Sequence, residues 1–183
     1  MKQLYKKKEL GVLAYFFENP KQEMYLRELA RKLNMSAATV MRITNFLVGE
    51  GMLEKRVERN ATYFRANLSP DFKELKKAYT VSKICGAGVI DLLKSKSVGL
   101  ASVLLYGSAA KGDDNAGSDY DFLVIASRCD VRASELSERL GREVSLQVYD
   151  ATGWKKTSKQ NRAFYLDVIS NSIALYGEKP VID

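Results

Sequence analysis

Two short stretches of the sequence carry groups suited to phosphate and metal chemistry. Gly107-Ser108 end one apolar run, and after ten further residues Asp119 and Asp121 open another. A glycine allows close backbone approach to a phosphate, and a serine hydroxyl with the following amides can cradle it. Carboxylates at positions i and i+2 of a strand point the same way, about 6.6 Å apart along it. The pair therefore predicts binding of Mg²⁺ or Mn²⁺ together with substrate phosphates.

The composition excludes several other chemistries. The 183 residues include no histidine, which rules out a Ser-His-Asp triad, a Cys-His protease, a His-ligated zinc site and a histidine general base. Cys85 and Cys129 have no CxxC spacing, as is typical of a protein in a reducing, cytoplasmic environment. No apolar run reaches the ~20 residues that span a bilayer, so we expect no membrane partner.

The positive charge is concentrated at the start of the chain. Of the formal net charge of +7, residues 1–70 hold 13 Lys and Arg against 7 Asp and Glu, whereas the remainder is nearly balanced. Such an excess predicts contact with a polyanion, the alternative being a solvated basic surface.

The same N-terminal residues have the pattern of three helices and a hairpin. Apolar residues recur at helical spacing over 6–18, 25–33 and 37–50, and Ser36 is a good N-cap for the third helix. Two β-type runs, 52–58 and 62–67, follow. This order, with the stretch LRELARKLNMSAATVMRITNFLVGEGML, resembles the winged helix-turn-helix family of DNA-binding domains.

That resemblance implies double-stranded DNA as a partner. The outward face of the third helix would enter the major groove, and arginines of the hairpin would reach phosphates or the minor groove. The alternative is a winged helix used for protein contacts or a homodimer. The predicted DNA-binding residues are Ser36, Ala37, Thr39, Arg42, Asn45, Arg56, Arg59 and Arg65.

The C-terminal motif LLYGSAAKGDDNAGSDYDFLVI resembles the signature of the nucleotidyltransferase superfamily that includes DNA polymerase β, and especially its minimal branch. The resemblance implies that Gly107 and Ser108 bind a nucleoside triphosphate, with Lys111 neutralising phosphate charge. It also implies that Asp119 and Asp121 are catalytic and hold the metal. The aromatic residues that follow the motif are expected to lie mainly in the core, and Trp154 is the one to test for nucleobase contact.

The sequence departs from this family at its third carboxylate. In the strand predicted over 142–149, alternation sets Val144, Leu146 and Val148 on one face, and the position of the family's aspartate falls on Ser145. Glu143, on the same face as Ser145, is a weaker substitute. Because base catalysis contributes about 10²–10⁴-fold, the domain is either a slow transferase or a nucleotide-binding domain without turnover.

Together these features predict an α+β protein. Residues 1–70 form a winged helix-turn-helix domain, 71–87 a connecting helix, and 88–183 a small nucleotidyltransferase-like domain with a mixed β-sheet flanked by helices. Three functions stay open at this point. They are a DNA-binding regulator that transfers a nucleoside monophosphate to a hydroxyl of a protein or small acceptor, an inactive nucleotide sensor, and an antitoxin-like partner of a toxin.

Overall fold

The computed structural model describes residues 5–182. By its internal contacts the chain divides between Lys76 and Lys77 into two compact units. No helix in the described range is both long enough and apolar enough to cross a membrane.

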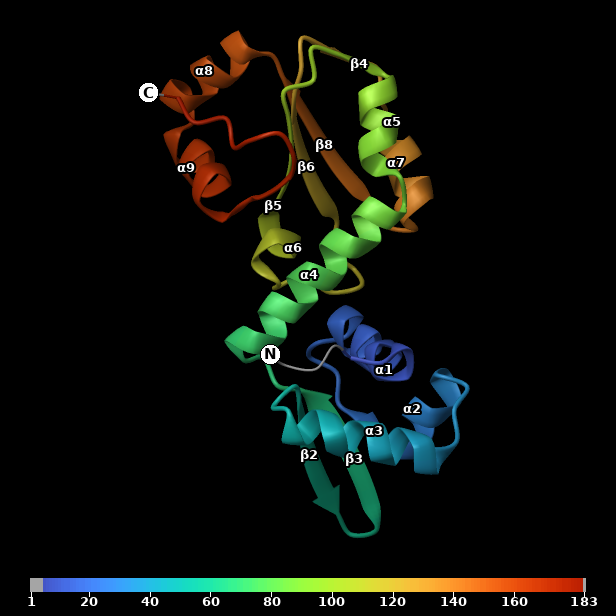
Figure 1. Cartoon of the computed structure of the whole chain (residues 1–183). Helices are drawn as coiled ribbons and strands as arrows, with labels where there is room; N and C mark the ends of the chain where they lie inside the picture. The colour runs from blue at the N-terminus through green and yellow to red at the C-terminus, as the bar shows by residue number, and fades with distance from the viewer. Residues whose placement is uncertain (1–4, 183) are drawn as a thin grey trace. The chain divides into compact units, whose positions relative to one another are not determined.

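The N-terminal unit has the three helices and the hairpin that the sequence predicts (Figure 1). The helices are α1 (Lys7–Glu18), α2 (Leu26–Lys32) and α3 (Ala37–Gly49), and the hairpin strands are β2 (Leu53–Glu58) and β3 (Ala61–Ala66). A further strand, β1 (Met24–Tyr25), pairs antiparallel with β3. It was not predicted, because two residues are too few to show the alternation of a strand.

The start of α3 is fixed by its N-cap, because the Ser36 hydroxyl accepts a hydrogen bond from the Thr39 amide at 3.2 Å. The helix buries Val40, Ile43 and Leu47 and contacts both α1 and α2. Its opposite face is exposed to solvent.

Helix α4 (Pro70–Gly86) follows the hairpin, and the division between the two units falls within it. Ser69 caps its first turn, accepting from the Phe72 amide at 3.3 Å. Gly88, at φ +68°, separates α4 from α5 (Val89–Ser95), an interruption that the sequence predicts at 86–88.

The C-terminal unit is built on a mixed four-stranded sheet in the order β8-β6-β5-β9. Central β6 (Tyr120–Ile125) pairs antiparallel with β5 (Ser102–Tyr106) and parallel with β8 (Val144–Tyr149). Strand β9 (Ile173–Tyr176) pairs antiparallel with β5. The predicted mixed sheet is confirmed, and so is the α+β class. The two-residue strands β4 (Ser97–Val98) and β7 (Arg128–Cys129), a separate antiparallel pair, were missed.

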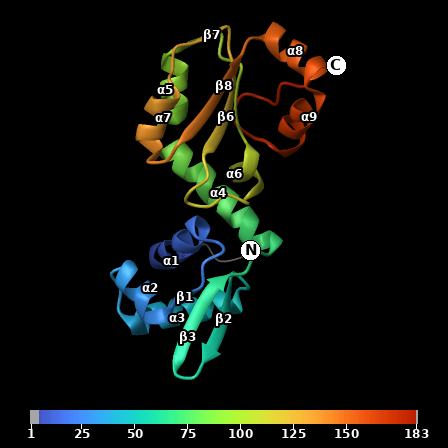
Figure 2. The ribbon, with the colours of Figure 1, turned by 180° about the vertical axis from the view of Figure 1, so that it is seen from behind.

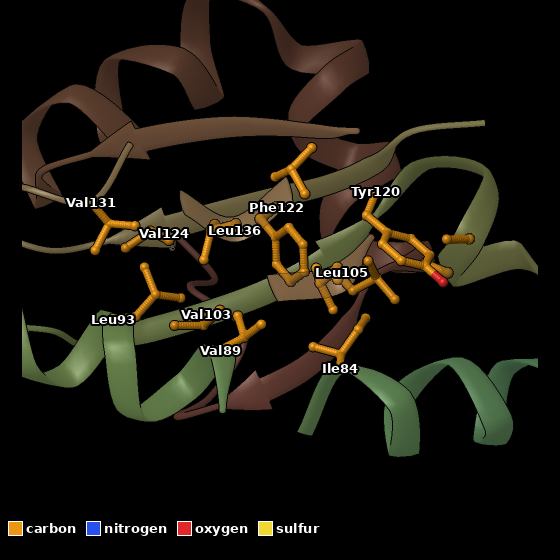
Figure 3. Packing of buried hydrophobic residues seen from close by; sticks show 14 of the residues in the cluster. Ile84, Val89, Leu93, Val103, Leu105, Tyr120, Phe122, Val124, Val131 and Leu136 are labelled. Carbon is orange, nitrogen blue, oxygen red and sulfur yellow. The ribbon is translucent and has the colours of Figure 1, made fainter. Parts of the chain in front are cut away.

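Helices cover both faces of this sheet. Figure 2 shows α5 and α7 (Ala133–Leu140) on one side, and α8 (Ala151–Gln160) and α9 (Arg162–Asn171) on the other. Alternating β-strand residues divide between two cores. Phe122 and Val124 pack in the core under α5 and α7 with Ile84, Val103 and Leu105 (Figure 3). Leu104, Tyr106 and Leu123 pack in the other with Trp154 and Val168.

Strand β8 lies at the edge of the sheet. Val144 and Leu146 pack with the core under α5 and α7, but the Val148 side chain stays 41% exposed. Alternation predicts which face a residue takes, but not how deeply its side chain is buried.

Candidate functional site

A sharp turn at Gly107 connects β5 to the short helix α6 (Gly107–Lys111). The glycine has φ +69°, and a Cβ added there would stand 2.2 Å from Oδ2 of Asp121. Both facts restrict the position to glycine, since other residues rarely adopt this backbone and none could avoid the carboxylate. The turn therefore brings the backbone of the Gly107-Ser108 motif directly against Asp121.

The sheet register places three polar side chains in a row. Asp121 of β6 is paired with Tyr106 of β5 on one side and with Ser145 of β8 on the other. Asp121 lies on the same face as Leu123, and hence on the side of the sheet covered by α8 and α9. Asp119 lies two residues earlier, just before β6 begins, on that same face and more exposed to solvent.

The electrostatics of this row favour the presence of a cation. Burial, and then the negative charge of Asp119, raises the pKa of Asp121 above its usual range. Burial, and then the charge of Asp121, also raises the pKa of Tyr106, whereas a hydrogen bond with Ser145 lowers it. In the protein alone, burial and the neighbouring charge thus both disfavour ionised Asp121, and a bound cation would offset both effects.

Tyr106 was missed as a member of this site. As the last residue of an apolar strand it looked like a core residue, and indeed its ring packs edge-on against Phe164, with centroids 5.6 Å apart. Its position opposite Asp121 depends on the antiparallel register of β5 and β6, which cannot be inferred from the sequence of β5 alone.

Lys111, at the end of α6, is engaged with a helix far along the chain. Its Nζ lies 2.8 Å from Oδ1 of Asp167 on α9, and this hydrogen bond, followed by one from Asn171, lowers the pKa of Asp167. Both partners stay about 40% exposed, so the pair can separate at little cost.

The residues present fit a magnesium ion that is shared with phosphates rather than enclosed by protein. No group of three His, Cys, Asp or Glu side chains suited to a metal occurs within residues 5–182, so Glu143 does not complete a set with Asp119 and Asp121. Mg²⁺ is commonly held by one or two carboxylates plus substrate phosphate oxygens. The close pair of carboxylates beside the Gly107 turn matches that donor set.

The structure excludes the suggestion that Trp154 stacks on a nucleobase. Its side chain is only 1% exposed, and its Nε1 donates to the carbonyl of Pro180 at 2.7 Å. Trp154 instead packs between Tyr149 and Tyr165 in the core under α8 and α9. The core is the place expected for the aromatic residues of this region.

In the N-terminal unit, the predicted residues of α3 are brought together on its outer face. Ser36, Ala37, Arg42 and Asn45 are exposed and Thr39 is half-buried. Two arginines of α2, Arg27 and Arg31, lie beside the start of α3, where they line an open concavity together with Ser36 and Ala37. Small side chains flanked by arginines allow a helix to approach a phosphate backbone closely.

The hairpin places its cations on two different faces. Lys55 shares a side of β2 with Val57 and points toward α3, where its Nζ donates to Oδ1 of Asn45 at 3.2 Å. Arg56, the next residue along, therefore lies on the reverse side, and so does Arg65, since Arg65 is paired with Glu54. Sequence reasoning missed Lys55 because it did not assign the two faces of the hairpin.

Carboxylates neutralise the arginines on that reverse side. Arg56 bonds Glu23 at 2.6 Å and Glu58 at 2.5 Å, and its guanidinium lies 4.7 Å from the ring centre of Tyr63. Arg65 bonds Glu54 at 2.6 Å. Arg59, at the tip of the hairpin with φ +51°, is exposed. Of the three predicted hairpin arginines, two are thus engaged away from α3.

Comparison with known families agrees with this architecture. Residues 8–56 match the model of the IclR helix-turn-helix domain, and residues 88–168 match that of the nucleotidyltransferase domain. The chain therefore carries a helix-turn-helix domain followed by a nucleotidyltransferase domain, as its sequence motifs predict. No curated protein matches the chain in sequence.

Several solved structures are partly similar. One is a toxin–antitoxin crystal structure with AMP-PNP, at 23% identity and TM-score 0.39, covering 50% of this chain and 72% of that one. A mutant of the toxin–antitoxin MntA–HpeT has 20% identity, the same coverages and TM-score 0.40. AF1382 from Archaeoglobus fulgidus has 20% identity and TM-score 0.36, covering 42% and 85%. At these low values no property of those proteins is transferred to this chain.

Replacing Asp121 by Asn should stabilise the protein alone. Because its pKa is raised in the folded state, ionised Asp121 opposes folding, and the wild-type protein gains stability as the pH falls through this pKa. The Asn variant should unfold at a higher temperature than wild type at pH 7, and the difference should shrink on acidification. Thermal melts between pH 4 and 8 measure this.

Asp91→Asn is the matched control. Asp91 is exposed in the first turn of α5, where a negative charge favours the helix. Its removal should leave the melting temperature unchanged or lower it slightly. An Asp121→Asn variant that melts below wild type at pH 7 would contradict the destabilising effect assigned to ionised Asp121.

Proposed function

We propose that the chain is a DNA-binding regulator whose nucleotidyltransferase domain binds a nucleoside triphosphate with Mg²⁺. The observation that carries the nucleotide part is the contact of the Gly107 turn with Asp121, because it joins the predicted phosphate cradle to the predicted metal ligands. The family match over residues 88–168 supports the same assignment.

In this proposal each residue has a separate task. The backbone at Gly107 and the hydroxyl of Ser108 orient the triphosphate, and Lys111 leaves Asp167 to contact it. Asp119 and Asp121 hold the cation, which supplies charge neutralisation at the phosphates. Tyr106 and Ser145 are the partners of Asp121 on the two adjacent strands.

A second candidate function, slow transfer of a nucleoside monophosphate, is favoured by the family match. An acceptor hydroxyl oxygen would bond to the α-phosphorus, the bond to pyrophosphate would break, and the hydroxyl proton would pass to a base. The pairing of Ser145 with Asp121 weighs against rapid turnover, because it leaves that base role without a carboxylate. Nucleotide binding with little or no turnover is therefore our first choice.

For the N-terminal unit we propose a duplex DNA interface centred on α3. It comprises the outer face of α3, Lys55 and the hairpin tip at Arg59. Arg56 and Arg65 are left out of it, since they lie on the reverse face and are bonded to carboxylates. Regulation of transcription, with the nucleotide as signal, would follow from having both binding functions on one chain.

Nucleotide binding should require Mg²⁺ and both aspartates. Titration of a fluorescent ATP analogue should show saturable binding that EDTA abolishes. Asp119→Asn and Asp121→Asn should each weaken it at least tenfold, since each removes a charged metal ligand. Asp130→Asn, which removes only an exposed partner of Arg128, should bind as wild type. Wild-type nucleotide binding that persists in EDTA would contradict the proposed role of Mg²⁺.

Adding the missing carboxylate should increase turnover. Ser145→Asp places a carboxylate beside Asp121 on the adjacent parallel strand, where a base contributes about 10²–10⁴-fold. Pyrophosphate release from ATP with Mg²⁺, with glycerol as a simple hydroxyl acceptor, measures the rate. Ser145→Ala is the control and should stay at the wild-type level. Equal rates in the two variants, with nucleotide bound in both, would argue against this role for the position.

DNA affinity should depend on the α3 side of the hairpin and not on its reverse. Arg42→Ala and Lys55→Ala should weaken binding to a random-sequence duplex and lower the slope of log K against log[salt] by about 0.9 for each phosphate that is no longer neutralised. Fluorescence anisotropy at several salt concentrations gives both quantities.

Arg56→Ala and Arg65→Ala are matched controls, because each also lowers the net charge by one. They should change the slope much less than Arg42→Ala does. Equal reductions in affinity on both faces would mean that only net charge matters and that the proposed docking face is wrong.

A further inference from the structure

Arg142 is a cation buried beneath the candidate nucleotide site, at the start of the chain segment that enters β8. Its side chain is 6% exposed and lies 3.0 Å from Oδ2 of Asp114, itself 3% exposed. Burying a charged pair is costly unless its hydrogen-bonding groups are satisfied. The nucleotidyltransferase motif does not account for this ion pair. The contacts that Arg142 makes with the neighbouring loop do.

The guanidinium of Arg142 holds the loop that connects α6 to β6. Besides Asp114, it donates from Nε to the carbonyl of Ser118 and from a terminal nitrogen to that of Asn115. The loop is also tied internally, since the Asn115 amide donates to the Ser118 hydroxyl at 3.0 Å. One planar, forked group thus reaches three acceptors of a single loop, a geometry available to arginine and not to lysine.

The loop matters because Asp119 follows it directly. Strand β6 begins only at Tyr120, so Asp119 has no pairing of its own in the ladder to set its position. Its two neighbouring peptide groups are held instead. The carbonyl of Ser118 accepts from Arg142, and the amide of Tyr120 donates to the carbonyl of Glu143 at 2.9 Å. Residues 142 and 143 therefore fix the backbone on both sides of Asp119.

Arg142 also contacts the residue that separates the two aspartates. Its guanidinium carbon lies 4.2 Å from the ring centre of Tyr120, and Tyr120 is 1% exposed. Burial opposes the positive charge, but Tyr120 and Asp114 outweigh it and raise the pKa of Arg142. The group is charged throughout the physiological range and packs firmly against β6.

We propose that Arg142 is a positioning residue for metal binding, which holds Asp119 in register with Asp121 by clamping the Asn115–Ser118 loop. Arg142 does not touch the metal or nucleotide itself, because it lies with Tyr120 and Val144 on the face of the sheet opposite Asp121. This inference rests on the proposed Mg²⁺–nucleotide site and adds to it the element that keeps two repelling carboxylates in place.

Arg142→Lys tests the clamp, because it keeps the charge and removes the fork. The Mg²⁺ concentration for half-maximal binding of the fluorescent ATP analogue should rise by about 10- to 100-fold, the usual cost of losing a group that orients a metal ligand. Binding at saturating Mg²⁺ should stay closer to wild type. In the protein without ligands, amide hydrogen exchange measured by mass spectrometry should be faster in 113–121, with 102–106 of β5 as the internal reference.

Arg128→Lys is the matched control, since Arg128 is exposed and bonded only to Asp130 among the contacts described. It should change neither measurement. Asp114→Asn, which leaves the fork but removes its buried counter-charge, is the second variant should Arg142→Lys fail to fold. It should shift both measurements in the same direction.

The outcomes separate the clamp from the proposed function. If exchange in 113–121 is unchanged in Arg142→Lys, the clamp is refuted whether or not the wild type binds nucleotide. If exchange is faster but the Mg²⁺ requirement is unchanged, the residue is only structural and the inference is overturned. If the wild type binds no nucleotide, the proposed function fails, while faster exchange would still support the clamp on Asp119.

Discussion

The candidate site depends on the pairing of β6 along both of its edges. Asp121 is held by this ladder, with Tyr106 on one side and Ser145 on the other. The free energy that keeps the two carboxylates close does not come from the carboxylates, because burial, and then the charge of Asp119, raises the pKa of Asp121 and disfavours its ionised form. It comes from the strand hydrogen bonds and from the apolar residues Phe122 and Val124, buried completely on the far face. The sheet therefore holds Asp121 where its ionised form is unfavourable, and a bound cation would make that form favourable.

Much of this fold could be predicted because local signals and packing agree. The Ser36 cap, the glycine interruption near 88 and the apolar strand that follows the loop each produced the expected element. The two-residue strands were missed because they have no local signal and exist only through their partners. Val148 was assigned to the face of Val144 and Leu146, but its 41% exposure could not be predicted, since the sequence does not say that β8 is an edge strand.

The site was less predictable where it depends on register. The aspartate pair and the glycine turn have motif spacing, and Ser145 could be assigned by counting along one strand. Tyr106, Lys55 and Arg142 could not be found in this way, because their roles arise from a paired strand, a hairpin face and a buried loop contact. Trp154, which was considered for nucleobase contact, is buried in the core, as expected for the aromatic residues of this region.

The ion pairs on the hairpin change the meaning of the positive charge of the N-terminal region. Arg56 and Arg65 are compensated by Glu23, Glu58 and Glu54, so their side of the hairpin is nearly neutral while the α3 side keeps its cations. A polyanion at a distance would then exert a torque on this domain as well as an attraction. The domain would approach DNA with α3 facing it. A larger fraction of collisions would then have the orientation that lets the helix enter the groove.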